Sequence, residues 1–363
     1  MPPWRAPPSV GITGTREKAG CREEEQMATI QEQAAKVMGP LSGVATGWAL
    51  DLGLRLGVFE HLAGSERGAP PGTVASALSL DPQYTEVLLR AAYAGEILEK
   101  EGGAYRLGEH METLLLDTES PAFAGGTVKA IVGLREAYLR VRDAARTGDR
   151  FWWSDMSPEW IDSVGDTGQA YYRRFLDIVL PQLPDIGRKL ESGARYIDLA
   201  SGLCRGPAKI VQAFPSTKVT AVDCDEYTLE TAEREMKELD IGGNFTYVGS
   251  FLEDLDLDGG HDLAMINISL HEARDIEKAV ANAYAALDDG GHFVVHEFPF
   301  PESDEGLRTV PGRIMSGIQF FEAHIGCQLL PTSRFVELLD EAGFGDVGTI
   351  EVTPTHVVIH GRK

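Results

Sequence analysis

The segment from Tyr196 to Pro207 reads YIDLASGLCRGP and is typical of a turn from a buried strand into a helix. Loops that hold nucleotide cofactors at such turns commonly read acid-x-Gly-x-Gly-x-Gly. Asp198 and Gly202 fit this pattern, whereas Ala200 and Cys204 stand where the outer glycines belong. Both side chains are small. Even so, a residue with a Cβ atom adopts positive φ less readily than glycine and lets the backbone approach a ligand less closely. Because a pyrophosphate needs that approach over several amides, the loop favours a nucleoside without phosphates over NAD or ATP.

Asp223 is a second candidate for cofactor binding. It ends the next apolar run, 25 residues beyond Asp198, where an acid accepts hydrogen bonds from a ribose diol. The alternative is a helix-capping role, because Asp225 and Glu226 precede an expected helix at Tyr227–Leu239. The position within a βαβ unit favours the ribose role.

A group of histidines and carboxylates in the C-terminal half could face one pocket. Two histidines and a carboxylate with open positions are an arrangement that holds iron or zinc. The residues are far apart in sequence and show no H-x-x-x-H spacing, so a metal site is the alternative here and not the first expectation. The group comprises His271, Glu272, His296, Glu297, Glu322 and His324.

The apolar pattern from residue 193 onward predicts the elements that position these side chains. Short apolar runs alternate with amphipathic helices, which indicates βαβ units and a parallel, doubly wound α/β sheet. Ligands of such sheets bind beyond the carboxyl ends of the strands. The expected strands are Arg195–Leu199, Lys218–Val222, Phe245–Val248, Asp262–Ile268 and His292–His296.

The N-terminal part has a different pattern. Apolar residues recur at helical spacing over residues 28–62, with an interruption at Gly39-Pro40. Residues 73–92 follow in helix-turn-helix order, and two short strands around Gly102-Gly103 complete a winged helix. A DNA-binding regulator is disfavoured, because the second helix presents acidic side chains against a lone Arg90.

Composition and charge exclude several classes of partner. The chain has 363 residues and a formal charge of −23, which repels nucleic acid and anionic lipid. Its four cysteines show no C-x-x-C spacing, which is typical of a reduced cytoplasmic protein. No run of 18 apolar residues or signal-peptide core occurs. We therefore expect a cytoplasmic protein with a small-molecule partner, no nucleic acid and no membrane.

The winged-helix region, the helical middle, the strand-loop pattern and the ending FVELLDEAGF (Phe335–Phe344) together resemble a known family. It is the small-molecule O-methyltransferase-like group of class I S-adenosylmethionine-dependent methyltransferases, found in bacterial secondary metabolism. The resemblance covers residues 28–363 and implies a homodimer joined through the N-terminal domain. The expected domains are a disordered extension (1–26, with Met27 an alternative start), a winged-helix dimerisation domain (27–116), a helical linker and substrate cap (117–192) and a Rossmann-like cofactor-binding domain (193–363).

The resemblance also implies a cofactor site. The methionyl part of S-adenosylmethionine would lie on the loop around Gly202, the ribose on Asp223 and the adenine near Ser250 and Phe251. Many members have Asp where this chain has Ser250, which is a further departure beside those of the loop. The full expected set is Asp198, Ala200, Gly202, Asp223, Cys224, Ser250, Phe251 and Asn267.

The family's catalytic base is a histidine beyond the fourth strand, usually in His-Asp, and His271-Glu272 occupies that place. A neutral imidazole there takes a proton from the attacking hydroxyl, and Glu297 matches the acid that orients it. A helix-capping histidine is the alternative. The expected substrate residues are Trp153, Tyr172, Arg173, Phe320 and His324.

Two other readings of the family stay open. Related enzymes that methylate the carbon next to the keto group of a 2-oxo acid bind a metal through two histidines. His271 and His324 match that description, with iron or zinc as the metal. The altered glycine loop also leaves room for a non-methylating member, such as a hydroxylase or cyclase-like enzyme.

Overall fold

The computed structural model describes residues 28–65 and 67–363, and the extension expected at 1–26 lies outside them. The described residues divide into two units after Val44. From Ile30 onward, the described part of the first unit belongs to helix α1 (Ile30–Arg55). This helix continues through Gly39-Pro40, where the sequence predicted an interruption. Proline removes one backbone donor but has a helical φ, so the helix tolerates it here.

The helices and strands predicted around residues 58–107 are present. Helix α3 (Pro71–Leu78) is followed by α4 (Pro82–Ala94), whose capping residue Asp81 accepts hydrogen bonds from two backbone N–H groups. Strands β1 (Leu98–Glu101) and β2 (Ala104–Leu107) form an antiparallel hairpin around two glycines with positive φ. This is helix-turn-helix order followed by a two-stranded wing. The short helix α2 spans Val58–Ala63.

Residues 111–191 are mainly helical, as expected. Helix α8 is capped by Ser157, which accepts a hydrogen bond from the Trp160 backbone. Short helical turns at Phe175–Val179 and Leu180–Gln182 join α8 to α9. The helices are α5 (Met111–Leu115), α6 (Gly125–Gly133), α7 (Arg135–Thr147), α8 (Pro158–Arg174) and α9 (Pro184–Glu191).

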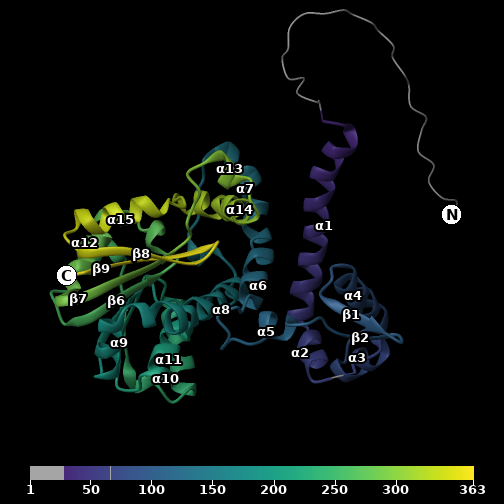
Figure 1. Cartoon of the computed structure of the whole chain (residues 1–363), viewed down its shortest axis with the longest axis horizontal. Helices are drawn as coiled ribbons and strands as arrows, with labels where there is room; N and C mark the ends of the chain where they lie inside the picture. The colour runs from purple at the N-terminus through teal and green to yellow at the C-terminus, as the bar shows by residue number, and fades with distance from the viewer. Residues whose placement is uncertain (1–27, 66) are drawn as a thin grey trace, which may run out of the picture. The chain divides into compact units, whose positions relative to one another are not determined.

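A seven-stranded sheet follows in the order β5-β4-β3-β6-β7-β9-β8, which confirms the predicted Rossmann-like α/β class (Figure 1). Strands β3 to β7 pair in parallel, and β9 runs antiparallel to β7 and β8. The order reverses between β3 and β6, the place where such sheets bind ligands. The strands are β3 (Arg195–Leu199), β4 (Lys218–Asp223), β5 (Phe245–Gly249), β6 (His261–Asn267), β7 (Leu287–Glu297), β8 (Gly345–Thr353) and β9 (His356–Arg362).

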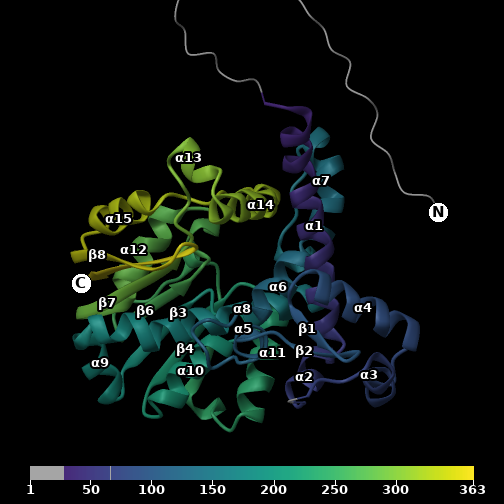
Figure 2. The ribbon, with the colours of Figure 1, turned by 45° about the vertical axis from the view of Figure 1, so that its right-hand side comes forward.

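Helices cover both faces of this sheet (Figures 1 and 2). Tyr196 packs on the face that carries α9, α10 (Arg205–Ala213) and α11 (Glu226–Glu238). The next residue, Ile197, packs on the opposite face, against α12 (Ile276–Ala286) and α15 (Thr332–Glu341). Burial on both faces explains why the strands are apolar runs and do not alternate.

Two further helices, α13 (Asp304–Leu307) and α14 (Val310–Ile325), lie between β7 and α15 in the chain. In the part of the chain that the structure describes, no helix is both long and apolar enough to span a membrane.

Candidate active site

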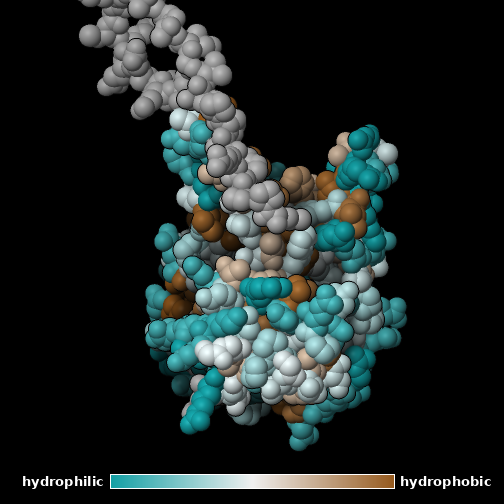
Figure 3. Space-filling model, turned by 90° about the vertical axis from the view of Figure 1, so that its right-hand side faces the viewer, coloured by the Kyte–Doolittle hydropathy of each residue, from teal (hydrophilic) through white to brown (hydrophobic). Residues whose placement is uncertain are grey.

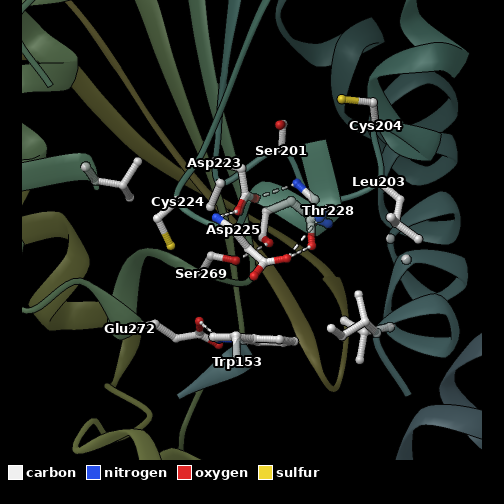
Figure 4. A pocket seen from close by; sticks show the side chains of 18 of the residues that line it. Trp153, Ser201, Leu203, Cys204, Asp223, Cys224, Asp225, Thr228, Ser269 and Glu272 are labelled. Carbon is white, nitrogen blue, oxygen red and sulfur yellow. Dashed lines mark hydrogen bonds between the residues drawn. The ribbon is translucent and has the colours of Figure 1, made fainter. Parts of the chain in front are cut away.

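The loops that follow β3, β4, β5 and β6 line one pocket, and helix α8 contributes to another side of it (Figure 4). The parallel strands bring these loops to one edge of the sheet, as the sequence predicted. Trp153 and Tyr172 of the expected substrate residues also line it. From the expected cofactor set, the lining residues are Ala200, Gly202, Asp223, Cys224, Ser250, Phe251 and Asn267.

The loop after β3 keeps the backbone of a glycine loop although two of its glycines are replaced. The φ angles of Ala200, Gly202 and Cys204 are 55°, 53° and 56°. A left-handed conformation costs a residue with a Cβ atom about 1–2 kcal/mol. The Cys204 side chain is fully buried within the core cluster that contains Tyr172 and Tyr196. The loop therefore has the shape that close ligand approach needs, and two strained residues maintain it.

Asp198 lies at the end of β3 but is not among the residues that line the pocket. The hydroxyl groups of Tyr172 and Tyr196 both donate to its Oδ2 atom. Burial raises the pKa of this carboxyl well above its usual value, although the Tyr172 hydrogen bond acts in the opposite direction. Asp198 therefore lies beside the loop and supports it. It does not lie at the pocket surface, where we expected it from the sequence.

Asp223 connects two of the loops. Its Oδ2 atom accepts a hydrogen bond from the Gly202 N–H at 2.9 Å, and its Oδ1 atom accepts one from the Asp225 N–H at 3.0 Å. Burial raises the pKa of Asp223, and the backbone hydrogen bonds from Asp225 and Gly202 oppose that shift. The capping role belongs to its neighbour, because the Asp225 carboxylate accepts from the Thr228 N–H at the start of α11.

His271 lies in the short helical turn Leu270–Glu272 after β6 and is held by Glu297 at the end of β7. Its Nδ1 atom is 2.8 Å from Glu297 Oε2 and 2.9 Å from Oε1, and its backbone N–H also donates to Glu297 at 3.2 Å. On its other side, Nε2 is 3.4 Å from Glu322 Oε2. The three side chains are at most 4% exposed. The sequence had paired His271 with Glu297 but gave Glu322 no separate role.

The charge state of His271 follows from these neighbours. Burial by itself lowers the His271 pKa, but the charges of Glu297 and Glu322 outweigh burial and raise it well above the usual value. The imidazolium form cannot accept a proton. A role as general base therefore requires that the proton on Nε2 first be removed.

Glu272 joins His271 to the pocket. The indole N–H of Trp153 donates to Glu272 Oε2 at 2.8 Å, and both residues line the pocket (Figure 4). Burial, followed by the charge of Glu322, raises the pKa of Glu272 well above its usual value. Ligand atoms of His271, Glu272 and Glu322 lie within 4.8 Å of one another.

The structure does not bring His324 to this cluster. Its Nε2 atom is 3.2 Å from the Ala137 carbonyl oxygen, and its ring centroid is 3.8 Å from that of Phe151. Glu322 and His324 are two positions apart on α14, so they point about 200° apart around the helix. The expected pairing of His271 with His324 is therefore corrected, because Glu322 occupies that position.

Three other expectations also differ from the structure. Arg173 forms an ion pair with Asp177, and Phe320 is 54% exposed, so neither lines the pocket. His296 is buried with its Nδ1 atom 2.9 Å from His356 Nε2, outside the His271 cluster. The sequence pattern identified the helices and strands that carry these residues. It did not determine which face of each helix or strand the side chains occupy.

Comparisons with known proteins agree with this architecture. A family model described as a methyltransferase domain matches residues 197–293. The ubiquinone/menaquinone biosynthesis C-methyltransferase of Psychromonas ingrahamii is 32% identical over 31% of this chain, and the match spans 45% of that relative's length. The tetracenomycin polyketide synthesis 8-O-methyl transferase of Streptomyces glaucescens is 23% identical over 87% of this chain and 92% of its own.

Solved structures extend the likeness of the fold to nearly the whole chain. Human N-acetylserotonin methyltransferase, in complex with S-adenosylmethionine, aligns with a TM-score of 0.67 at 20% identity, covering 93% of this chain and 99% of that one. An O-methyltransferase family protein from Burkholderia thailandensis aligns with a TM-score of 0.63 at 19% identity, covering 93% and 98%. The fold is therefore the one that these solved methyltransferases share, and residues 197–293 match a methyltransferase domain. The relatives and solved structures that this chain resembles are methyltransferases, and O-methyltransferases are among them.

Proposed function

We propose that the protein transfers the methyl group of S-adenosylmethionine to a small-molecule acceptor in the pocket at the ends of β3 to β6. One observation carries this proposal. Ala200, Gly202 and Cys204 all hold the left-handed backbone of a glycine loop, and Asp223 connects that loop to the next. Strained residues persist in a fold where the surroundings impose them, most often at functional sites.

The polar groups of the pocket suit this cofactor. Ser201 Oγ and Asn267 Oδ1 are buried and lack hydrogen-bond partners among the described residues. An amino-acid ammonium group provides donors for such oxygens. The Asp223 carboxylate suits a ribose diol. The Ser250 hydroxyl donates to the Phe251 carbonyl, so the adenine would be held mainly by contact with the Phe251 side chain.

The cofactor's sulfonium supplies an electrophilic methyl group. A nucleophilic oxygen, nitrogen or carbon of the acceptor forms a bond to the methyl carbon as the methyl–sulfur bond breaks, and S-adenosylhomocysteine is the leaving group. The acceptor's proton passes to a base. His271 is the candidate, with Glu297 holding its Nδ1 atom, once Nε2 is free of its proton.

The acceptor is a small, largely apolar molecule with an ionisable group. Trp152 and Trp153 line the pocket together with Ile161 and Val164 from α8. Such lining is typical of small-molecule sites. The named polyketide relative supports secondary metabolism as the setting. A 2-oxo acid methylated at carbon is the second candidate, favoured by the cluster around His271.

We also infer that two copies associate through α1. This helix exposes apolar side chains at intervals of three and four residues, which places them in one stripe. Figure 3 shows apolar patches among hydrophilic residues on one face of the molecule. Contiguous exposed apolar surface marks interaction sites. The stripe comprises Val37, Leu41, Val44, Trp48 and Leu52.

Titration calorimetry of the purified protein with S-adenosylmethionine and S-adenosylhomocysteine tests the proposal. We expect both to bind, and Asp223→Ala to lose most of the affinity. Asp289→Ala is the matched control, because Asp289 is exposed at the start of β7, at the opposite end of the sheet from the pocket. No heat from either compound with the wild-type protein would contradict the proposed function.

A further inference from the structure

We propose that Arg205 is a positioning residue that holds helix α8 against the cofactor loop and thereby slows the release of the cofactor from the pocket. Arg205 directly follows Cys204 in the loop after β3 and begins helix α10. It also lines the pocket. The effect on cofactor release rests on the proposed function, whereas the link that Arg205 makes between helices does not.

The guanidinium group of Arg205 connects three helices. Its Nε and Nη2 atoms donate to the two carboxylate oxygens of Glu235 on α11, at 2.8 and 2.7 Å. Nη2 also donates to Asp162 Oδ1 on α8 at 2.6 Å. Nη1 donates to Asp166 Oδ1 at 2.9 Å and to the Asp162 carbonyl oxygen at 3.2 Å, both on α8. A guanidinium has five N–H donors, and these five bonds use all of them.

The complete use of these donors decides between two roles for Arg205. An arginine in a cofactor pocket commonly binds a carboxylate or phosphate of the ligand. Here a ligand carboxylate would have to displace a protein acceptor from a side chain that is 19% exposed. Paired bonds to one carboxylate, such as those to Glu235, are also among the stronger hydrogen bonds in proteins. Arg205 therefore positions the helices that form the pocket and does not bind the ligand.

A second cation on the same face of α10 repeats this arrangement. Lys209 lies one turn beyond Arg205, and its Nζ atom forms an ion pair with Glu119 in the segment between α5 and α6. The Lys209 side chain is 5% exposed, and lysine is rarely so buried unless it is paired. Residues four apart on a helix share a face. Helix α10 therefore presents two cations to acids of the helical segment 117–192.

Close packing at two glycines brings α8 into direct contact with the cofactor loop and with α10 (Figure 1). A Cβ atom on Gly165 of α8 would lie 2.7 Å from the Leu203 side chain, and a Cβ atom on Gly206 of α10 would overlap the Tyr172 ring. Each glycine thus leaves the space that a side chain from the other element fills. Because Leu203 and Tyr172 both line the pocket, any movement of α8 away from the loop changes the shape of the pocket.

Removal of the Arg205 charge would loosen this wall of the pocket. Asp162, Asp166 and Glu235 would then surround one position without the cation that now separates them. Like charges at such distances repel, and the repulsion acts between α8 and α11. Movements of the elements that enclose a site limit ligand release in many enzymes. We therefore expect the loss of Arg205 to speed the exit of the cofactor.

Surface plasmon resonance with the immobilised full-length protein tests the proposal. It measures the dissociation rate constants of S-adenosylmethionine and S-adenosylhomocysteine, which a mere loss of folded protein leaves unchanged. We expect Arg205→Gln to raise both by about tenfold, because hydrogen bonds to charged groups contribute more than neutral ones. Arg195→Gln is the matched control and should keep the wild-type values. Arg195 begins β3 at the end away from the pocket and also pairs with two acids, Asp262 and Asp288.

A second variant and a second measurement keep the result interpretable. Asp162→Asn removes one charge from a side chain that is 55% exposed, so it should fold and raise the dissociation rate constants about threefold. It decides the question if Arg205→Gln does not fold. Hydrogen exchange of the α8 backbone amides, measured without ligand, should be faster in Arg205→Gln than in Arg195→Gln.

The outcomes separate this proposal from the proposed function. Faster dissociation together with faster exchange in α8 supports the role of Arg205. Unchanged dissociation in both Arg205→Gln and Asp162→Asn overturns it. If the wild type binds neither compound, the methyl-transfer function is rejected, and the exchange rates of α8 alone then decide whether Arg205 holds that helix.

Discussion

The carboxylate of Asp223 accepts a hydrogen bond from the backbone N–H of Gly202 at 2.9 Å. This bond joins the end of β4 to the loop after β3, across the edge of the sheet where ligands bind. The residue expected to hold the ribose thus also fixes the loop expected to hold the methionyl group. Loss of one contact should affect both parts of the cofactor.

Replacing Asp223 by asparagine keeps the size of the side chain and removes its charge. The amide nitrogen must then face either the Gly202 or the Asp225 N–H, both of which now donate to the carboxylate. We expect the affinity for S-adenosylmethionine to fall by about 1–3 kcal/mol, the range for an unsatisfied buried group. Titration calorimetry measures this against Asp289→Asn. Unchanged affinity would show that Asp223 does not contact the cofactor.

Glycine at position 200 should be neutral or stabilising. It removes the left-handed strain of Ala200 but adds freedom to the unfolded chain, so we expect a change of about 0 to +1 kcal/mol in unfolding free energy. Cys204→Gly relieves the same strain but empties a fully buried position. It should destabilise the protein by about 1–2 kcal/mol, because the cavity term exceeds the strain. Urea unfolding compares the pair, and two variants of equal stability would contradict this account.

The buried pair of His296 and His356 makes stability depend on pH. Burial lowers the pKa of His296 to about 3 and that of His356 well below its usual value. The unfolded chain therefore binds more protons than the folded one below about pH 6.5. Stability from these groups is complete above that pH and is lost as the pH falls toward 3.

We expect His296→Gln to reduce this dependence. Urea unfolding at pH 7, 6 and 5 should give a smaller loss of free energy for His296→Gln than for the wild type, whatever its stability at pH 7. His110→Gln, at an exposed position, should follow the wild type. If the unfolding free energies of His296→Gln and the wild type fall equally between pH 7 and 5, the buried His296 and His356 pair does not cause the pH dependence.

The apolar stripe on α1 predicts the assembly state. Leu41→Asp places a charge inside the stripe, which we expect to shift the protein from dimer to monomer at micromolar concentration. Ser42→Asp adds the same charge on another side of the helix and should leave the dimer intact. Light scattering coupled to size-exclusion chromatography measures the molar mass of each variant in solution. A dimeric Leu41→Asp variant would place the contact elsewhere.

The parallel strands β3 to β7 were predictable within a residue or two, because a sheet buried on both faces needs apolar runs, whereas the antiparallel strands β8 and β9 were not predicted. Strand β7 is the exception, because it begins at Leu287 and the expected strand began at His292. Gly290-Gly291 interrupts the apolar pattern, so the first residues of the strand could not be recognised from the sequence. The pocket was also predictable, because parallel strands end at one edge. The roles of Glu322 and His324 were not, since a shift of two positions on α14 decides which one faces His271.

The bond between Trp153 and Glu272 has an optical consequence. An indole that donates to a carboxyl group emits according to that group's charge and to the polarity of its surroundings, and Trp153 meets both conditions inside the pocket. We expect a cofactor or acceptor that enters the pocket beside Glu272 to alter this contact. The chain has five tryptophans, and the ring centroid of Trp160 lies 5.0 Å from that of Trp153, so the difference spectrum between wild type and Trp153→Phe reports this pair of indoles. We therefore expect the fluorescence of Trp153 to change when a ligand binds in the pocket. Stopped-flow fluorescence can then measure the rate of binding without an added label.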